Sequence, residues 1–255
     1  MSAPPAEVEV LGVRVHAVDR AELLVRVDAL VEAGARATVG YANVHVLNTA
    51  ARDAELRRFL NGLDLCYCDG NGVKWAAAAT GQSLPERMTG ADWIWDLAAA
   101  AEGRWRIFWV GGEPGVAEAA AERLRARHPG LELATDHGFH EAVEPLLDRV
   151  NAFRPHIVLV GMGTPAQERW VARWRGAIEA PVVWVLGATH DFVSGRVARG
   201  PAWLHTEHEW LARLLVDPRR LWRRYLIGNA AFVGRVAKQR WRGEPRVPTS
   251  LNGQG

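Results

Sequence analysis

Cysteine is scarce in this sequence: only Cys66 and Cys68 occur among 255 residues. That scarcity excludes a small scaffold held together by disulfides. The Cys-x-Cys spacing also differs from the Cys-x-x-Cys of zinc and redox sites. Side chains two residues apart on a strand point to the same face. We therefore expect two reduced thiols in the core of a cytoplasmic protein.

Long apolar runs are also missing. No stretch of about 18 apolar residues occurs, so we expect no helix that spans a bilayer. Met1–Glu7 has no basic region followed by an apolar run, which predicts that there is no signal peptide. The net charge is only +2, but Arg196–Arg246 holds 12 basic and 4 acidic residues, a net +8. A basic segment of this kind favours an anionic partner, namely a membrane, a nucleic acid or a polyphosphate ligand.

Several catalytic signatures are absent as well. Without a Gly-x-Ser-x-Gly elbow, a common serine hydrolase is disfavoured. No Asp-x-Asp occurs in a turn beside a nucleotide-type motif, which argues against a metal-dependent sugar transferase. There is no His-Glu-x-x-His, so we expect no metal site. The histidines weighed for a metal site are scattered: His45, His137, His140, His190, His205 and His208.

What the sequence does have is a regular alternation of apolar strands and helical segments. Expected strands cover 8–15 (one strand or a hairpin), 37–42, 63–68, 106–110, 131–135, 156–160 and 182–186. Expected helices cover 20–33, 46–61, 73–80, 91–101, 116–128, 143–153 and 165–178. This alternation predicts an α/β fold, with a parallel sheet covered by helices on both faces. Ligands of such sheets bind beyond the carboxyl ends of the strands.

The pattern changes after Pro201. Trp203–Val216 and Arg219–Trp241 have helical periodicity, and the second stretch mixes aromatic residues with arginines. We predict an α/β body over 1–200, a helical basic appendage over 201–242 and a disordered tail over 243–255. The appendage either packs on the body or lies in a membrane interface, with its aromatic rings at headgroup depth. Its arginines also suit a diphosphate. No recognition module accompanies the charge, so we expect no nucleic-acid partner.

Two glycine-rich turns follow strands. Gly161–Ala166 fits Gly-x-Gly-x-x-Ala, and Gly111–Gly115 is similar. Such turns offer backbone N–H groups to a phosphate. A dinucleotide fingerprint also needs an acidic residue about 20 residues on: none ends the strand 182–186 after the first turn, whereas Asp136 lies at a roughly suitable distance after the second. Each turn is thus either a phosphate site or a plain tight turn. Gln167 and Glu168 follow directly, where an amide reads a uracil or sugar edge or simply faces solvent.

Asp69 follows the strand 63–68, at the point where a helix is expected to begin. One interpretation is a general base or charge stabiliser in a cleft. The other is an N-cap, a position at which aspartate is preferred. Spacing alone favours the cap.

Several segments, taken together and in order, resemble the bacterial WecG/TagA/CpsF glycosyltransferases. The matching pieces are Asn43, Cys68–Val73, Glu86–Asp92, Val110–Val116, His128-Pro129, Gly161–Glu168, Asp191-Phe192 with Gly195, Glu209–Leu214 and Pro218–Tyr225. Together they cover roughly Val8–Phe232. The chain departs from the family at Thr189-His190 and at His137–His140, where apolar and aromatic pairs are commoner.

The resemblance implies a Rossmann-like body with a C-terminal appendage. It also implies transfer of a sugar, often of the N-acetylmannosamine type, from a UDP-sugar to a polyprenyl-diphosphate-linked acceptor, without a metal. Our leading hypothesis is that this transfer inverts the anomeric configuration and uses no cofactor, with the UDP-sugar as co-substrate. Asp69 would be the base and Asn43 its neighbour. Substrate-binding roles are implied for Gly70, Asn71, Arg87, Gly111, Gly112, Gly161, Gly163, Thr164, Pro165, Gln167, Glu168, Asp191, Arg213, Arg220, Arg223 and Arg224.

On this hypothesis the protein works in the cytoplasm as a peripheral protein of the inner membrane face, where its appendage arginines reach phosphate oxygens. A homo-oligomer is compatible with it. Two alternatives stay open at this point. One is a soluble NAD(P)-dependent oxidoreductase that uses the glycine turns. The other is a non-catalytic, membrane-associated binding protein in which Asp69 is only a cap.

Overall fold

The computed structural model describes residues 3–197, 214 and 218–242. The elements of the first half are β1 (Glu7–Val10), β2 (Val13–His16), α1 (Arg20–Glu32), β3 (Ala37–Ala42), α2 (Val44–Ala50), α3 (Ala54–Asn61), β4 (Leu65–Cys68), α4 (Asn71–Ala79) and α5 (Gly90–Ala101). Those of the second half are β5 (Arg106–Gly111), α6 (Val116–Arg127), β6 (Glu132–Asp136), α7 (Glu144–Phe153), β7 (Ile157–Gly161), α8 (Ala166–Trp174), a 3₁₀ turn (Arg175–Ala177), β8 (Val182–Val185) and α9 (Thr189–Val193). The C-terminal helices are α11 (Pro218–Trp222), the π-helical turn Arg223–Ile227 and α12 (Gly228–Arg242).

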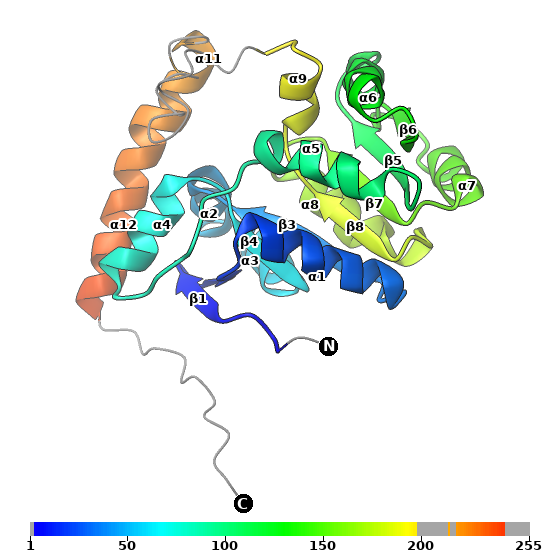
Figure 1. Ribbon diagram of the computed structural model, residues 1–255. Helices are drawn as coiled ribbons and strands as arrows, with labels where there is room; N and C mark the ends of the chain where they lie inside the picture. The colour runs from blue at the N-terminus through cyan, green and yellow to red at the C-terminus, as the bar shows by residue number, and fades with distance from the viewer. Residues whose placement is uncertain (1–2, 198–213, 215–217, 243–255) are drawn as a thin grey trace, which may run out of the picture.

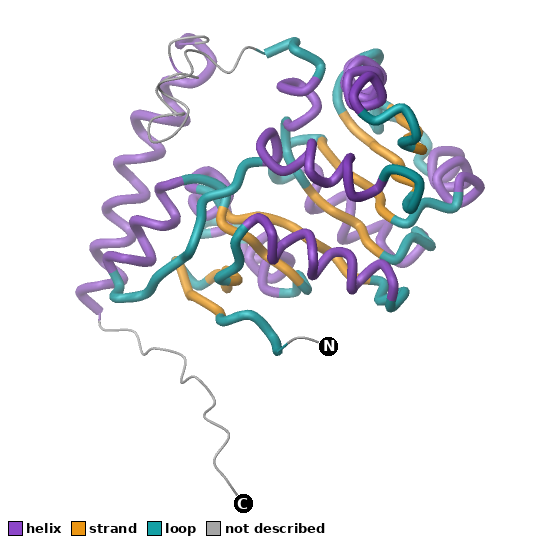
Figure 2. The backbone as a smooth tube through the Cα atoms, viewed as in Figure 1, coloured by secondary structure: helices purple, strands orange, loops and turns teal. Residues whose placement is uncertain are grey.

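The centre of the fold is a six-stranded parallel sheet in the order β4-β3-β8-β7-β5-β6 (Figure 1). Helices lie on both sides of it (Figure 2). The α/β prediction is therefore confirmed. The segment 8–15, left open as one strand or a hairpin, is the antiparallel hairpin β1-β2.

Alternating side chains of the central strands build two separate core layers. Trp109, Leu159 and Trp184 belong to one apolar cluster, together with residues of α1, α5 and α6. Their chain neighbours Phe108 and Val160 belong to the other, with α7 and α8. Because successive strand residues point to opposite faces, a strand covered on both sides must be apolar throughout.

Local sequence sets most element boundaries. Asp19 caps α1 by accepting a hydrogen bond from the Glu22 N–H at 2.8 Å. The single helix expected over 46–61 is wrong, because the chain forms two helices there. Asp53 caps the second helix by accepting from the N–H groups of Glu55 and Leu56. A side chain that satisfies these exposed N–H groups favours a new helix start over continuation.

Cys66 and Cys68 are free thiols buried in the core, as the sequence predicts. Burial raises the pKa of the Cys68 thiol to about 12, with a further contribution from the neighbouring Asp69 charge. Both thiols are therefore uncharged at neutral pH, as apolar packing requires.

The C-terminal helix α12 runs beside α4 at one side of the body (Figure 1) and also contacts α2. Phe232 and Val236 are buried in the core layer that also contains Trp109 and Trp184. Asn48 of α2 donates to the Gly228 carbonyl at 2.7 Å and accepts from Arg235, while Gln239 accepts from the Leu11 N–H at 3.1 Å. The described part of the appendage is thus a helix that docks on the body of its own chain. The boundary at residue 200 and the tail 243–255 lie outside the described residues. The expected helix over Trp203–Val216 also lies outside them, apart from Leu214.

Candidate active site

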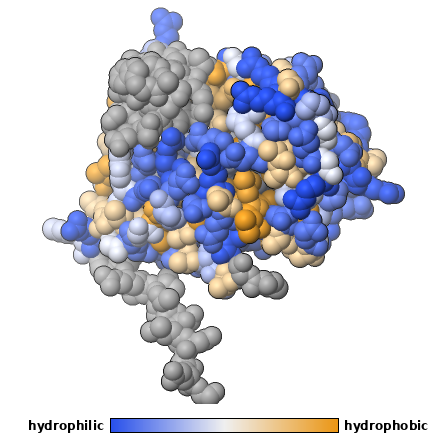
Figure 3. Space-filling model, viewed as in Figure 1, coloured by the Kyte–Doolittle hydropathy of each residue, from blue (hydrophilic) through white to orange (hydrophobic). Residues whose placement is uncertain are grey.

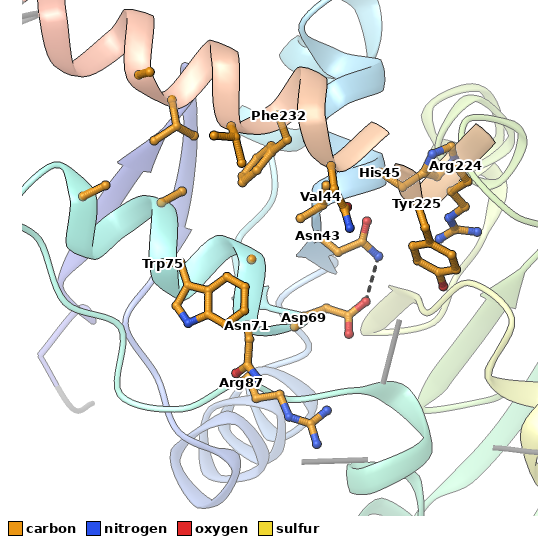
Figure 4. Close-up of a pocket in the computed structure, with 18 of the residues that line it drawn as sticks. Asn43, Val44, His45, Asp69, Asn71, Trp75, Arg87, Arg224, Tyr225 and Phe232 are labelled. Atoms are coloured by element: carbon orange, nitrogen blue, oxygen red, sulfur yellow. Dashed lines mark hydrogen bonds between the residues drawn. The ribbon is translucent and has the colours of Figure 1, made fainter. Parts of the chain in front are cut away.

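The parallel pairing of β3 and β4 brings Asn43 and Asp69 together. Ala42 and Cys68, the last residues of these strands, are register partners, and the Asp69 N–H donates to the Ala42 carbonyl at 2.9 Å. The next side chain of each strand meets the other across the sheet end. Asn43 Nδ2 donates to Asp69 Oδ2 at 2.8 Å, as the dashed line in Figure 4 shows. Because each residue directly follows a strand that is hydrogen-bonded to the other strand, the geometry of this pair is fixed.

The Asn43 side chain makes a second hydrogen bond, which restricts its orientation. It is the N-cap of α2, and its Oδ1 accepts from the Val46 N–H at 2.9 Å. With the amide oxygen held by the helix, the amide NH₂ points at the carboxylate. The N-terminus of α2 therefore fixes the Asn43 side chain, and Asn43 in turn orients the Asp69 carboxylate.

The structure contradicts the interpretation of Asp69 as an N-cap. The N-cap of α4 is Gly70, and the helix begins at Asn71 with no side-chain cap hydrogen bond. Gly70 has φ +101°, a value that L side chains rarely adopt. This turn leaves Asp69 half-buried outside the helix, at the wall of a cavity.

The cavity has a volume of about 580 Å³ and lies between the body and α12. Its two ends differ in chemistry. Asn43, His45, Asp69, Asn71, Arg87 and Thr89 give one end polar walls. The other end lies between α4 and α12 and is lined by Trp75, Ala76, Ala79, Phe232, Val233, Val236 and Ala237, with Arg240 beside them. Figure 4 shows Trp75 on α4 and Phe232 on α12, both among the side chains that line the cavity. We call this second end the apolar groove.

Arg224 and Tyr225 close the polar end from the appendage side. Both belong to the π-helical turn Arg223–Ile227 between α11 and α12. Such turns are rare and often occur at functional sites. Across the cavity, Arg87 is positioned by its neighbour Met88, whose N–H donates to the Cys68 carbonyl at 2.8 Å. The Arg87 guanidinium lies 3.7 Å from the Asp92 carboxylate. Two arginines from distant parts of the chain, Arg87 and Arg224, thus line the cavity near Asp69, in addition to Arg240 beside the apolar groove.

His45 is a cavity residue whose charge state is set by its surroundings. Burial and, to a smaller extent, the Arg224 charge lower the pKa of its imidazole to about 4. The ring is therefore neutral at physiological pH, and it adds no cation to the cavity. It also bonds to the Thr164 backbone, which links the cavity wall to the Gly161–Pro165 turn.

Gln167 and Glu168 are buried and do not line the cavity. Gln167 accepts from the Gly187 N–H at 3.0 Å and donates to Tyr41 and Glu168. Glu168 Oε1 also accepts from the Thr164 hydroxyl at 2.9 Å, and burial raises the pKa of this carboxyl. This network fastens the 161–165 turn to the end of β8.

The two glycine turns lie side by side at the carboxyl ends of the paired strands β5 and β7. A Cβ on Gly111 would lie 2.0 Å from the Gly161 carbonyl oxygen, so the turns approach too closely for any side chain. Gly112 and Gly161 both face the buried His190, and Asp191 follows it. The residues predicted to bind substrate therefore form two groups at the same edge of the sheet.

The first group lines the cavity: Asn43, Asp69, Gly70, Asn71, Arg87 and Arg224. The second group lies at the glycine turns and outside the cavity: Gly111, Gly112, Gly161, Gly163, Thr164, Pro165, Gln167, Glu168 and Asp191. Arg223 lies against Trp222, its Cζ 5.3 Å from the ring centroid. Arg213 and the side chain of Arg220 lie outside the described residues.

Sequence reasoning missed Trp75, Thr89, Tyr225 and the apolar residues of α12 as cavity residues, and it weighed His45 only as a metal ligand. The position of His45, two residues beyond Asn43 at the same strand end, is a local pattern that points to the site. The partners on α4 and α12 are about 150 residues apart in the chain, and nothing in either segment indicates their contact.

Comparison with known proteins completes the description. The model of the "Glycosyl transferase WecG/TagA/CpsF family" matches residues 8–246. Proteins from Staphylococcus aureus strains NCTC 8325 / PS 47 and COL, named N-acetylglucosaminyldiphosphoundecaprenol N-acetyl-beta-D-mannosaminyltransferase, are each 28% identical over 200 residues. That match covers 77% of this chain and 78% of each relative.

These matches do not support the oxidoreductase alternative, because the glycine turns fall inside a transferase family match rather than a nicotinamide-binding one. They also oppose a non-catalytic binding protein. Because this family model spans nearly the whole chain, the chain belongs to the WecG/TagA/CpsF glycosyl transferase family and is a glycosyltransferase.

Proposed function

We propose that the protein transfers a sugar of the N-acetylmannosamine type from a UDP-sugar to a polyprenyl-diphosphate-linked saccharide, with inversion and without a metal ion. One observation carries the proposal. The Asp69 carboxylate lines a cavity in a geometry fixed by Asn43, and that cavity has arginines at one end and an apolar groove at the other. The names of the Staphylococcus relatives support the choice of sugar and acceptor.

The proposed chemistry is a single displacement. Asp69 accepts the proton of the acceptor hydroxyl as its oxygen forms a bond to the anomeric carbon. The bond from that carbon to the diphosphate oxygen breaks, and UDP leaves with the electron pair. Arg87 and Arg224 line the same cavity, so their charges stabilise the negative charge that develops on the diphosphate. Asn43 holds the base in one orientation throughout.

The apolar groove suits the lipid of the acceptor. Trp75 is 58% exposed and Val233 66% exposed, although both line a cavity that is continuous with Asp69. A prenyl chain along α4 and α12 would cover these side chains and leave its diphosphate near the arginines. Burial of apolar surface of this kind contributes about 25 cal/mol per Å².

An exposed apolar surface on the appendage supports work at a membrane surface. Trp222, Leu226, Ile227 and Trp241 are exposed, Trp241 to 95%. Arg219, Arg223 and Lys238 are exposed on the same helical stretch. Hydrophilic residues predominate on the face of the body drawn in Figure 3. Within the described segments, every helix is too short or too polar to cross a bilayer. We infer peripheral binding to the inner face of the cell membrane, where apolar residues enter the interface and basic ones meet anionic lipid.

The decisive experiment is Asp69→Asn, which keeps the shape of the side chain and removes the base. Transfer from UDP-N-acetylmannosamine to a short-chain prenyl-diphosphate N-acetylglucosamine is followed by product mass. We expect a loss of turnover of about 10²- to 10⁴-fold, while UDP binding stays unchanged. Asp28→Asn is the matched control, since Asp28 is an exposed carboxylate paired with Arg104. Wild-type turnover in Asp69→Asn would remove this residue from the mechanism.

A further inference from the structure

A second cluster of ligating side chains lies well away from the cavity. Asp136 is the last residue of β6, and His137 and His140 follow it in the connection to α7. One ligand atom from each of these three residues lies within 4.8 Å of the other two, and all three side chains are partly exposed. No part of the proposed transfer uses them.

Contacts within the cluster hold the three side chains close together. His140 Nε2 contacts Asp136 Oδ1, and the rings of His137 and His140 lie 4.0 Å apart between centroids, tilted by 34°. The second oxygen of Asp136 is held by Arg149 of α7. In metal sites the ligating carboxylates usually accept such hydrogen bonds from neighbouring side chains.

The turn that carries the histidines is held closed. Gly138 has φ +73°, and its N–H donates to Asp136 Oδ1 at 3.2 Å. A Cβ at Gly138 would lie 2.5 Å from Met162 Cε and 2.8 Å from Val110 Cγ1. The backbone of the turn therefore packs directly against the ends of β5 and β7, which keeps both histidines beside Asp136.

We infer that Asp136, His137 and His140 bind one divalent ion of the zinc type, with water in the fourth position. Imidazole nitrogen and carboxylate oxygen form a ligand set typical of zinc and its first-row neighbours rather than of magnesium or calcium. The ion would take the place of the proton between His140 and Asp136. It would fix the β6–α7 connection at this edge of the sheet.

The site is separate from the transfer chemistry. β4, which carries Asp69, and β6, which carries Asp136, are the two opposite edge strands of the sheet. Five inter-strand spacings separate them, roughly 24 Å. An ion at Asp136 thus cannot reach a sugar at Asp69, and metal-independent transfer is compatible with it. Sequence spacing alone missed the site, because Asp-His-x-x-His is not among the common zinc signatures.

The test is titration of the full-length, tag-free, chelator-treated protein with Zn²⁺ by calorimetry. We expect one ion per chain. His137→Ala and His140→Ala each remove one of three ligands, so each should weaken binding at least about tenfold. His128→Ala is the matched control: His128 also pairs with a carboxylate, Glu102, at 3.3 Å, but among the described residues this pair has no third ligating side chain beside it. This variant should bind Zn²⁺ like the wild type.

Substitution with Co²⁺ gives a readout that does not depend on the variants. A four-coordinate site with nitrogen and oxygen ligands should give visible absorption bands that the Zn²⁺-loaded protein lacks. Absence of Zn²⁺ binding, a Co²⁺ spectrum identical to that of the free ion, or equal affinity in His137→Ala, His140→Ala and the control would overturn the assignment.

Discussion

The bond between Asn43 and Asp69 allows a positioning role to be separated from a structural one. Asn43 both caps α2 and donates to the Asp69 carboxylate at 2.8 Å. Asn43→Ala removes both interactions, whereas Asn43→Ser keeps a good capping group but is too short to supply the amide donor. The two variants therefore differ mainly in the cap.

The expected magnitudes follow from these interactions. Loss of the cap costs about 1 kcal/mol of stability, so Asn43→Ala should unfold more easily than Asn43→Ser. Loss of a hydrogen bond to a charged group is worth about 1.5–3 kcal/mol, or roughly 10- to 150-fold in rate if the bond persists in the transition state. Both variants should show this loss of turnover.

The assay combines urea denaturation with pH–rate profiles. The donated bond favours the ionised carboxylate, so its removal should move the acid-side fall in turnover to higher pH. A purely structural role would change stability and leave the profile in place. Wild-type turnover with a wild-type profile in Asn43→Ser, beside a destabilised Asn43→Ala, would refute the argument that Asn43 positions the base.

Three further predictions concern other parts of the molecule. The pKa of His45 is about 4 when folded and near 6.5 when unfolded, so the unfolded state binds the proton first as pH falls. Lowering the pH from 7.5 to 5 should thus reduce the stability of the wild type by about 2 kcal/mol more than that of His45→Asn, measured by denaturant titration; equal losses would show that His45 is not the cause. A Cβ at Gly72 would lie 2.3 Å from Val44 Cγ2, so Gly72→Ala should force α4 and α2 apart. We expect a cost of about 1–3 kcal/mol, and an unchanged melting temperature would contradict this close packing. Ile227 is 56% exposed on the appendage, and Ile227→Asp should weaken binding to anionic vesicles at least tenfold, since a buried isoleucine is worth about 1.5–3 kcal/mol. Vesicle sedimentation measures the effect, and undiminished binding would exclude Ile227 from the membrane surface.

Sequence reasoning was successful where structure is set locally. The alternation of apolar strands with helical segments predicted a parallel sheet covered on both faces, and strands such as Ile157–Gly161 contribute to both core layers. It failed at Asp53, where a single capping residue divides one expected helix into two. The rule for Asp69 also failed in an instructive way. Aspartate before a helix usually caps it, but Gly70 moved the helix start one residue on.

The sequence by itself determined the fold class, the family and the strand ends that carry the chemistry, because hydrophobic period and motif order are local properties of the chain. Only the tertiary structure decided which of those ends share a cavity. It placed Asp69, Arg87 and Arg224 around one cavity, buried Gln167 and Glu168 in a hydrogen-bonded network, and put Trp75 and Phe232 in the wall of that cavity. The physical reason is that strand order and helix docking follow from burial of apolar surface between segments far apart in the chain, and no local pattern encodes which segments will meet.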